Sequence, residues 1–232
     1  NSSEPFQVKV KTEDVDTTDL VKSYGFGVKK IQINPSKKVK FSIVNGAYPE
    51  LFGVALDGET GVAVDNFAMR GSSAIGYHTM NRKIYAQQLK QLNVRCIIFQ
   101  YGINVVPNVR KDYSYYTKML VKELRSIKRA YPGISIIVVG PSDMSRNLNG
   151  QKVSYPNIAL INREMQNAAF ETGCAFWDLY SAMGGKNSMP QWVSKGLAQK
   201  DYTHFSYNGA KYVGEMLFEA ILEQVQNQGY LN

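Results

Sequence analysis

The sequence predicts an α/β fold, because after about residue 71 helical patterns alternate with short apolar segments. An apolar run such as Ile134-Ser135-Ile136-Ile137-Val138-Val139 is typical of a strand covered on both faces. Strands that alternate with helices imply right-handed crossovers onto a parallel sheet, here of flavodoxin-like, three-layer α/β/α type. The expected strands are 95–100, 134–139 and 174–179, and the expected helices are 81–92, 111–131, 157–172 and 210–226.

The first part of the chain has a different pattern, in which polar and apolar residues alternate at every second position up to about residue 69. This period predicts antiparallel strands buried on one face. The segments concerned are 6–10, 28–33 and 39–44, followed by 51–56 and 61–67, which flank the turn residues Asp57-Gly58-Glu59-Thr60 and predict a hairpin. We therefore expect a β-rich part over 1–60, resembling part of a β-sandwich, and an α/β domain over 61–232.

The composition is that of a globular protein, with 232 residues of which 44% are hydrophobic and 20% charged. A net charge of +8 allows nucleic acid, an anionic membrane or an acidic polymer as partner. The basic residues are scattered, which favours a solvated helix face and argues against nucleic acid; examples at helical spacing are Lys118, Lys122, Arg125 and Arg129. No apolar stretch approaches the ~20 residues of a membrane span.

The two cysteines, Cys96 and Cys174, lie within apolar runs and are predicted to be buried thiols. Two cysteines at this spacing form neither a disulfide framework nor a metal-ligand pattern.

The loop Asp201-Tyr202-Thr203-His204 precedes the last predicted helix, for which Ser206 and Asn208 are candidate N-caps. A carboxylate three residues before a histidine can bond the imidazole, fix its tautomer and stabilise its charged form. That support is what a general base needs to deprotonate a serine hydroxyl. From spacing alone, a surface pair or a satisfied polar loop is the favoured interpretation.

Two further loops carry candidate oxyanion donors. Gly102 allows a tight turn after the predicted strand 95–100, and the Asn104 side chain two residues later could aim an N–H at a developing oxyanion. Gly71 ends another expected strand and could offer its backbone N–H in the same way. Taken singly, each is also compatible with an ordinary turn, with Asn104 as a capping residue.

In combination, these three loops resemble the motif blocks of the SGNH (GDSL-type) hydrolase family over residues 62–222. The most specific part is Asp-x-x-His followed by Ser206-Tyr207-Asn208-Gly209-Ala210. The resemblance implies that Gly71 and Asn104 form the oxyanion hole, that His204 is the base and that Asp201 orients it. It implies no metal or organic cofactor.

The chain departs from the family pattern because the Gly-Asp-Ser block that carries the nucleophilic serine is absent. Ser72, Ser73 and Ser142 lie one or two residues after a glycine but have neither the right sequence nor the right place, so we expect them to be structural. In bacterial relatives that deacetylate peptidoglycan or other polysaccharides, a carbohydrate-binding-like β-sandwich separates this block from the glycine block. Residues 1–69 resemble the trailing part of such an insert, which places the nucleophile upstream of Asn1 and makes an N-terminal peptide of the same gene product a candidate partner.

The resemblance thus implies a serine esterase that removes acyl groups, above all acetyl, from a carbohydrate or cell-wall polymer. The expected location is bacterial and secreted, periplasmic or on the cell surface. The alternative is an inactive relative that binds glycans through aromatic residues such as Trp177, Trp192 or Tyr202. A lipase or thioesterase is disfavoured because no lid-like apolar segment is evident.

The esterase hypothesis makes a geometric prediction. His204 should lie within hydrogen-bond reach of Asp201 at the carboxyl edge of the sheet, and Asn104 should face the same cleft. His78, the other histidine, should lie outside that cleft.

Overall fold

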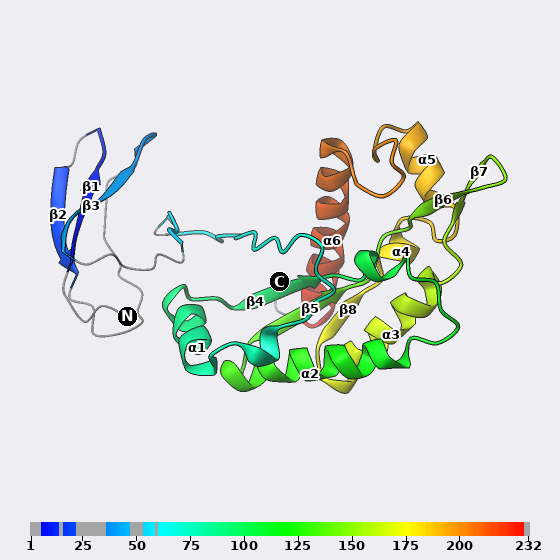
Figure 1. Ribbon diagram of the computed structural model, residues 1–232, viewed down its shortest axis with the longest axis horizontal. Coiled ribbons are helices and arrows are strands. Elements are labelled where there is room, and N and C mark those ends of the chain that lie inside the picture. Colours follow the sequence, from blue (N-terminus) through cyan, green and yellow to red (C-terminus); the bar gives the residue numbers. More distant parts are fainter. Residues whose placement is uncertain (1–5, 14–15, 22–35, 47–52, 59, 230–232) are drawn as a thin grey trace. The chain divides into compact units, whose positions relative to one another are not determined.

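The structure is a computed structural model that describes residues 6–13, 16–21, 36–46, 53–58 and 60–229 (Figure 1). The chain divides into two compact units, the first formed by 1–68 with 81–93 and the second by 69–80 with 94–232. The expected domain boundary between residues 60 and 61 stays a prediction.

The first unit contains an antiparallel sheet of order β2-β1-β3, made of β1 (Phe6–Lys11), β2 (Asp16–Val21) and β3 (Lys40–Gly46). The strands predicted at 6–10 and 39–44 are confirmed as β1 and β3, whereas β2 was not predicted. The segment 28–33 lies outside the described residues. The same unit holds α1 (Arg82–Gln91), the helix predicted at 81–92, whose N-cap Asn81 accepts a hydrogen bond from Ile84 N at 3.2 Å.

The hairpin predicted around Asp57–Thr60 is wrong, because the described residues 53–58 and 60–68 form no strand. The alternating side chains are instead exposed, with Val62 92% and Phe67 76% accessible. An alternating pattern makes a segment suitable for a strand, but its backbone N–H and C=O groups also need a partner strand. The described part of the chain gives these residues none.

The second unit is built on a parallel sheet of order β4-β5-β8, formed by β4 (Cys96–Gln100), β5 (Ser135–Val139) and β8 (Ala175–Trp177). All three strands were predicted. Since the strands are parallel, their carboxyl ends meet at one edge, and the loops that follow them are gathered there.

Helices cover both faces of this sheet (Figure 1). On one side lie α2 (Ser114–Ala130) and α3 (Ile158–Glu171), and on the other α4 (Leu179–Ala182), α5 (Ser188–Ser194) and α6 (Tyr207–Asn227). Successive side chains of β5 point to opposite faces of the sheet and contact both helix layers. Ile137 and Val139 pack into a cluster that includes Val213 of α6, whereas Ile136 and Val138 are buried on the opposite face. The expected three-layer α/β/α fold is confirmed.

A β-hairpin of β6 (Ser145–Leu148) and β7 (Gln151–Ser154) projects beyond the carboxyl end of β5 and was not predicted. Its two-residue turn has positive φ at both Asn149 (52°) and Gly150 (82°). Asn-Gly is the preferred sequence for such turns, so the signal was present in the sequence.

The expectation that both cysteines are buried is correct for Cys174 and wrong for Cys96. Cys96 is the first residue of β4, which among the described strands has a neighbour on one side only, namely β5. Ile98, in the middle of β4, is likewise 48% exposed. An apolar run predicts a strand, but not whether both of its edges and faces are covered.

We predict that Gly209→Ala destabilises the protein. A Cβ at Gly209, in the first turn of α6, would overlap the carbonyl of Leu197, and this contact is with backbone that cannot easily move. Overpacking of this kind costs about 1–3 kcal/mol. Gly214→Ala is the matched control in the same helix, because its Cβ would meet nothing within 4 Å and should be neutral or slightly stabilising. Urea unfolding of both variants would contradict the prediction if their midpoints moved alike.

Candidate active site

His204 and Asp201 form a hydrogen-bonded pair in the loop between α5 and α6. The His204 Nδ1 atom lies 2.7 Å from Asp201 Oδ2. Asp201 Oδ1 accepts from the backbone N–H groups of Thr203 at 3.0 Å and His204 at 3.1 Å. The carboxyl group is therefore oriented by its own loop, and it fixes in turn the orientation of the imidazole. The predicted contact between the two side chains is confirmed.

Partial burial raises the pKa of Asp201, but the hydrogen bonds that the carboxylate accepts from the His204 ring and from the backbone N–H groups of His204 and Thr203 outweigh it. The pKa of Asp201 is therefore held below its ordinary value. An ionised Asp201 at neutral pH can stabilise a positively charged imidazolium, as an orienting acid must.

Backbone hydrogen bonds hold both ends of the loop that carries the His204–Asp201 pair. Gln199 N donates to His204 O at 2.8 Å, and Ser206 N donates to Leu197 O at 3.0 Å. The Ser206 side chain caps α6 by accepting from Gly209 N at 3.1 Å. Of the two candidate caps, Ser206 is thus the N-cap, and Asn208 lies inside the helix. The absent side chain of Gly209 lets α6 begin directly against Leu197.

The β6–β7 hairpin connects the pair to the carboxyl end of β5. Ser145 N donates to Tyr202 O at 3.0 Å, and Lys152 Nζ lies 4.8 Å from the centre of the Tyr202 ring. Tyr202 has a φ of 59°, a left-handed conformation that is uncommon outside glycine and is retained where neighbours constrain it. This support depends on the β6–β7 hairpin, which was not predicted.

Asn104 is presented by a sharp turn directly after β4. Gly102 has a φ of 100°, and a Cβ there would lie 2.6 Å from Met165 Sδ, so the turn approaches α3 more closely than other residues allow. The Asn104 Nδ2 atom donates to Ser72 O at 2.9 Å. A side-chain amide has two N–H groups, and the second one has no partner among the described residues.

Gly71 lies at the third position of a turn in which Ser72 N donates to Met69 O at 3.3 Å, and its φ of 71° places it in the left-handed region. The bond from Asn104 to Ser72 O connects this turn to the turn after β4. The structure thus brings together the two candidate oxyanion donors, whereas a common cleft with His204 stays a prediction.

Within the described residues, Ser72, Ser73 and Ser142 are not paired with His204, whose ring bonds to Asp201. The Ser72 hydroxyl accepts from Ala74 N at 3.1 Å, and Ser142 is buried. That these serines are structural stays a prediction.

Trp192 belongs to the core and is only 6% exposed, with its Nε1–H donating to Met183 O at 3.0 Å. Trp177 packs against the same cluster. The suggestion that Trp192 binds glycans is therefore wrong, because burial and a satisfied indole leave no surface for a sugar.

Within the described residues, no helix is both long and apolar enough to span a membrane. No group of three or more His, Cys, Asp or Glu side chains is arranged to hold a metal ion in that same part of the chain.

A three-layer α/β/α unit with a histidine–aspartate pair beyond its sheet is an arrangement that serine hydrolases use. The model of the GDSL-like lipase/acylhydrolase family matches residues 25–212, which is most of the chain. The chain therefore belongs to the GDSL-like lipase/acylhydrolase family.

A solved structure of a peptidoglycan O-acetylesterase is similar to this chain, with 26% sequence identity and a TM-score of 0.57. The similarity covers 63% of this chain and 41% of that protein's chain, so the residues compared span less than half of the esterase. A search among curated proteins found no match.

We predict that His204→Ala raises the pKa of Asp201 toward its ordinary value, because the variant removes the side-chain hydrogen bond and the charge interaction that lower it. Since the folded-state pKa is depressed, these contacts stabilise the protein above the unfolded-state pKa and lose their effect as the pH falls through the folded-state value. Carbon-detected NMR titration of the carboxyl groups measures the pKa of Asp201 in the unmutated protein and in the variant.

Asp112 is the control for this titration, because its pKa is lowered chiefly by hydrogen bonds from Ser114. It should titrate identically in the two proteins. An unchanged Asp201 titration in His204→Ala would contradict the prediction.

Proposed function

We propose that this chain supplies the base, the orienting acid and two oxyanion donors of a serine esterase that removes acyl groups, above all acetyl, from a carbohydrate. The observation that carries the proposal is the 2.7 Å contact between His204 Nδ1 and Asp201 Oδ2. The Asn104–Ser72 bond supports it, because it fixes a second group of donors beyond the same sheet.

In the proposed mechanism, a serine Oγ attacks the ester carbonyl carbon while His204 Nε2 takes the hydroxyl proton. Asp201 stabilises the imidazolium, and the Gly71 N–H and the free Asn104 N–H bind the tetrahedral oxyanion. His204 then protonates the departing sugar hydroxyl. Water attacks the acyl-enzyme, giving its proton to His204, and the carboxylic acid is released as the serine regains its proton.

We place the nucleophilic serine upstream of Asn1, since the sequence contains no Gly-Asp-Ser block. The exposed side of β4 supports this assignment: among the described strands it pairs only with β5, and Ile98 stays 48% exposed. A strand added beside β4 would pair its free N–H and C=O groups and reduce the exposed apolar area.

We further propose an O-acylated cell-wall polysaccharide as substrate and a secreted, periplasmic or cell-surface location. The protein in the similar solved structure is a peptidoglycan O-acetylesterase, and the net charge of +8 suits an acidic polymer. The core position of Trp192 disfavours the alternative of a purely glycan-binding relative.

In a nucleophile-bearing form of the protein, His204→Ala should abolish ester cleavage, because no other described group can take the serine proton from this position. Asn104→Ala should lower kcat by roughly 10²- to 10³-fold, the usual cost of losing one oxyanion donor. Lys211→Ala on the exposed surface of α6 is the control and should behave as the unmutated protein. Full turnover in His204→Ala would remove this residue from the mechanism.

The 232-residue chain by itself should not hydrolyse p-nitrophenyl acetate above the uncatalysed rate, whereas the gene product that includes the residues preceding Asn1 should. Intact mass and N-terminal sequencing establish which peptides are present in each sample. Robust hydrolysis by residues 1–232 alone would overturn the upstream assignment and direct attention to Ser72, Ser73 or Ser142.

A further inference from the structure

We propose that Glu123 is a positioning residue of the active site. It holds residues 69–80, here called the glycine-block segment, in the conformation that places Gly71 and Ser72 next to Asn104. This inference rests on the proposed function, since it assigns a cause to the geometry of the oxyanion donors.

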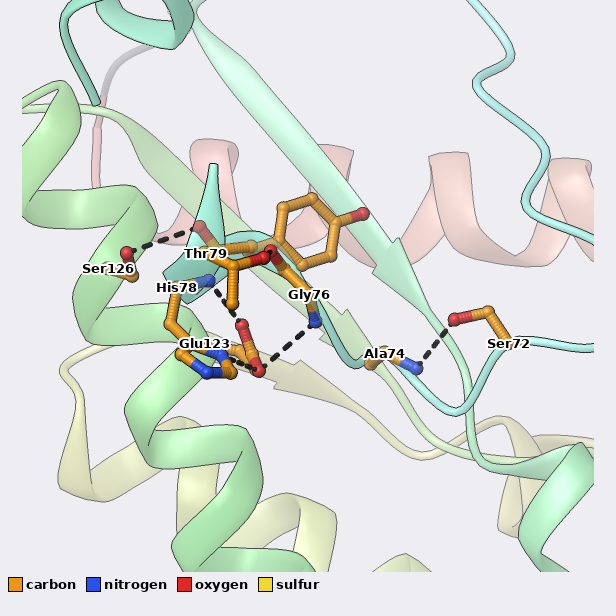
Figure 2. A network of polar contacts seen from close by, with 8 residues as sticks. Ser72, Ala74, Gly76, His78, Thr79, Glu123 and Ser126 are labelled. Atoms are coloured by element: carbon orange, nitrogen blue, oxygen red, sulfur yellow. Dashed lines mark hydrogen bonds and ion pairs between the residues drawn. The ribbon is translucent and has the colours of Figure 1, made fainter. Parts of the chain in front are cut away.

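Glu123 lies in the middle of α2 and is completely buried, at 0% exposure. Its Oε1 atom accepts from Gly76 N at 3.3 Å and lies 2.6 Å from His78 Nδ1, and its Oε2 atom accepts from His78 N at 2.8 Å (Figure 2). Both oxygens of one side chain are thus used by two residues of the glycine-block segment.

The position of Glu123 in the sequence is unusual. It falls on the face of α2 that also carries Tyr116, Leu120 and Ile127, which are all buried. A carboxyl group on the apolar face of a helix loses its water and must find donors within the protein. Here the donors are N–H groups of a segment more than forty residues away in sequence, so satisfying Glu123 fixes where that segment lies.

The glycine-block segment is held from a second direction by β4 and the turn after it. The hydroxyl groups of Tyr77 and Tyr101 are 2.8 Å apart, and Asn104 Nδ2 donates to Ser72 O. Between these attachments, Ala74 is buried and has a φ of 70°, a strained value for alanine. Strain of this kind persists only where surrounding contacts impose it.

The Glu123 contacts bear on catalysis because few residues separate Gly76, which bonds to Glu123, from Ser72, which bonds to Asn104. Gly71 is five residues from Gly76 in the same segment, and Ser72 O is the acceptor that orients Asn104. An oxyanion hole requires its donors to be in place before the reaction, and small displacements lower the rate strongly. Loss of the Glu123 contacts should therefore change turnover more than substrate binding.

The first experiment follows hydrogen–deuterium exchange of the 232-residue chain by mass spectrometry. In Glu123→Gln, one carboxyl oxygen becomes an NH₂ group that cannot accept from the backbone, so peptides covering residues 71–80 should exchange faster. Glu164→Gln is the matched control, because Glu164 Oε2 accepts from Thr117 Oγ1 at 2.6 Å between α2 and α3, outside the glycine-block segment. Exchange in residues 71–80 should not change in this control.

The second experiment measures kcat and KM in the nucleophile-bearing protein. Glu123→Gln and His78→Ala should lower kcat by about 10- to 100-fold with KM nearly unchanged. His78→Asn should restore most of the turnover, because the asparagine amide N–H occupies a position close to that of ring Nδ1 and can donate to Glu123. His78 is partly exposed, so the pair of His78 variants tests the proposal even if Glu123→Gln does not fold.

Unchanged exchange of residues 71–80 in both Glu123→Gln and His78→Ala would overturn the proposal. Faster exchange with unaltered kcat would also overturn it, because the contacts would then be structural only, and the proposed function would stand. Absent turnover in the unmutated nucleophile-bearing protein would instead overturn the proposed function, while the exchange measurement would still decide whether Glu123 holds the segment.

Discussion

The parallel pairing of β4, β5 and β8 is the constraint on which the candidate site depends. Parallel strands bring their carboxyl ends to one edge, so the turn after β4 that carries Asn104 and the β6–β7 hairpin after β5 are gathered there. The hairpin then contacts the loop of Asp201 and His204 through Ser145 and Tyr202. Asn104 and the loop of Asp201 and His204, about a hundred positions apart in sequence, therefore both lie beyond this sheet.

Buried polar side chains fix the loops at this edge. Asp143 is fully buried, and it accepts from the Ser154 hydroxyl at 2.6 Å and from Met189 N at 2.8 Å, which connects the β6–β7 hairpin to α5. Glu123 fixes the glycine-block segment to α2 in the same way. A buried carboxyl group without donors is costly, so each of these residues specifies one arrangement of its loop.

The same physical requirement applies to strand-like segments that have no partner strand among the described residues. Residues 62 and 67 have strand-like side chains and yet stay exposed, and β4 has one partner among the described strands. Both features concern backbone and apolar surface that a neighbouring strand would cover.

The sequence by itself determined the three parallel strands, the helices between them and the Asp201–His204 pair, because apolar periodicity and a three-residue spacing are local properties. It failed for the segments 53–58 and 60–68 and for Cys96, since strand pairing and burial depend on contacts distant in sequence. Only the tertiary structure decided that Asn104 bonds to Ser72 and that Glu123 bonds to Gly76 and His78. No spacing rule relates these residues, because their proximity comes from the packing of α2 and β4 around the glycine-block segment.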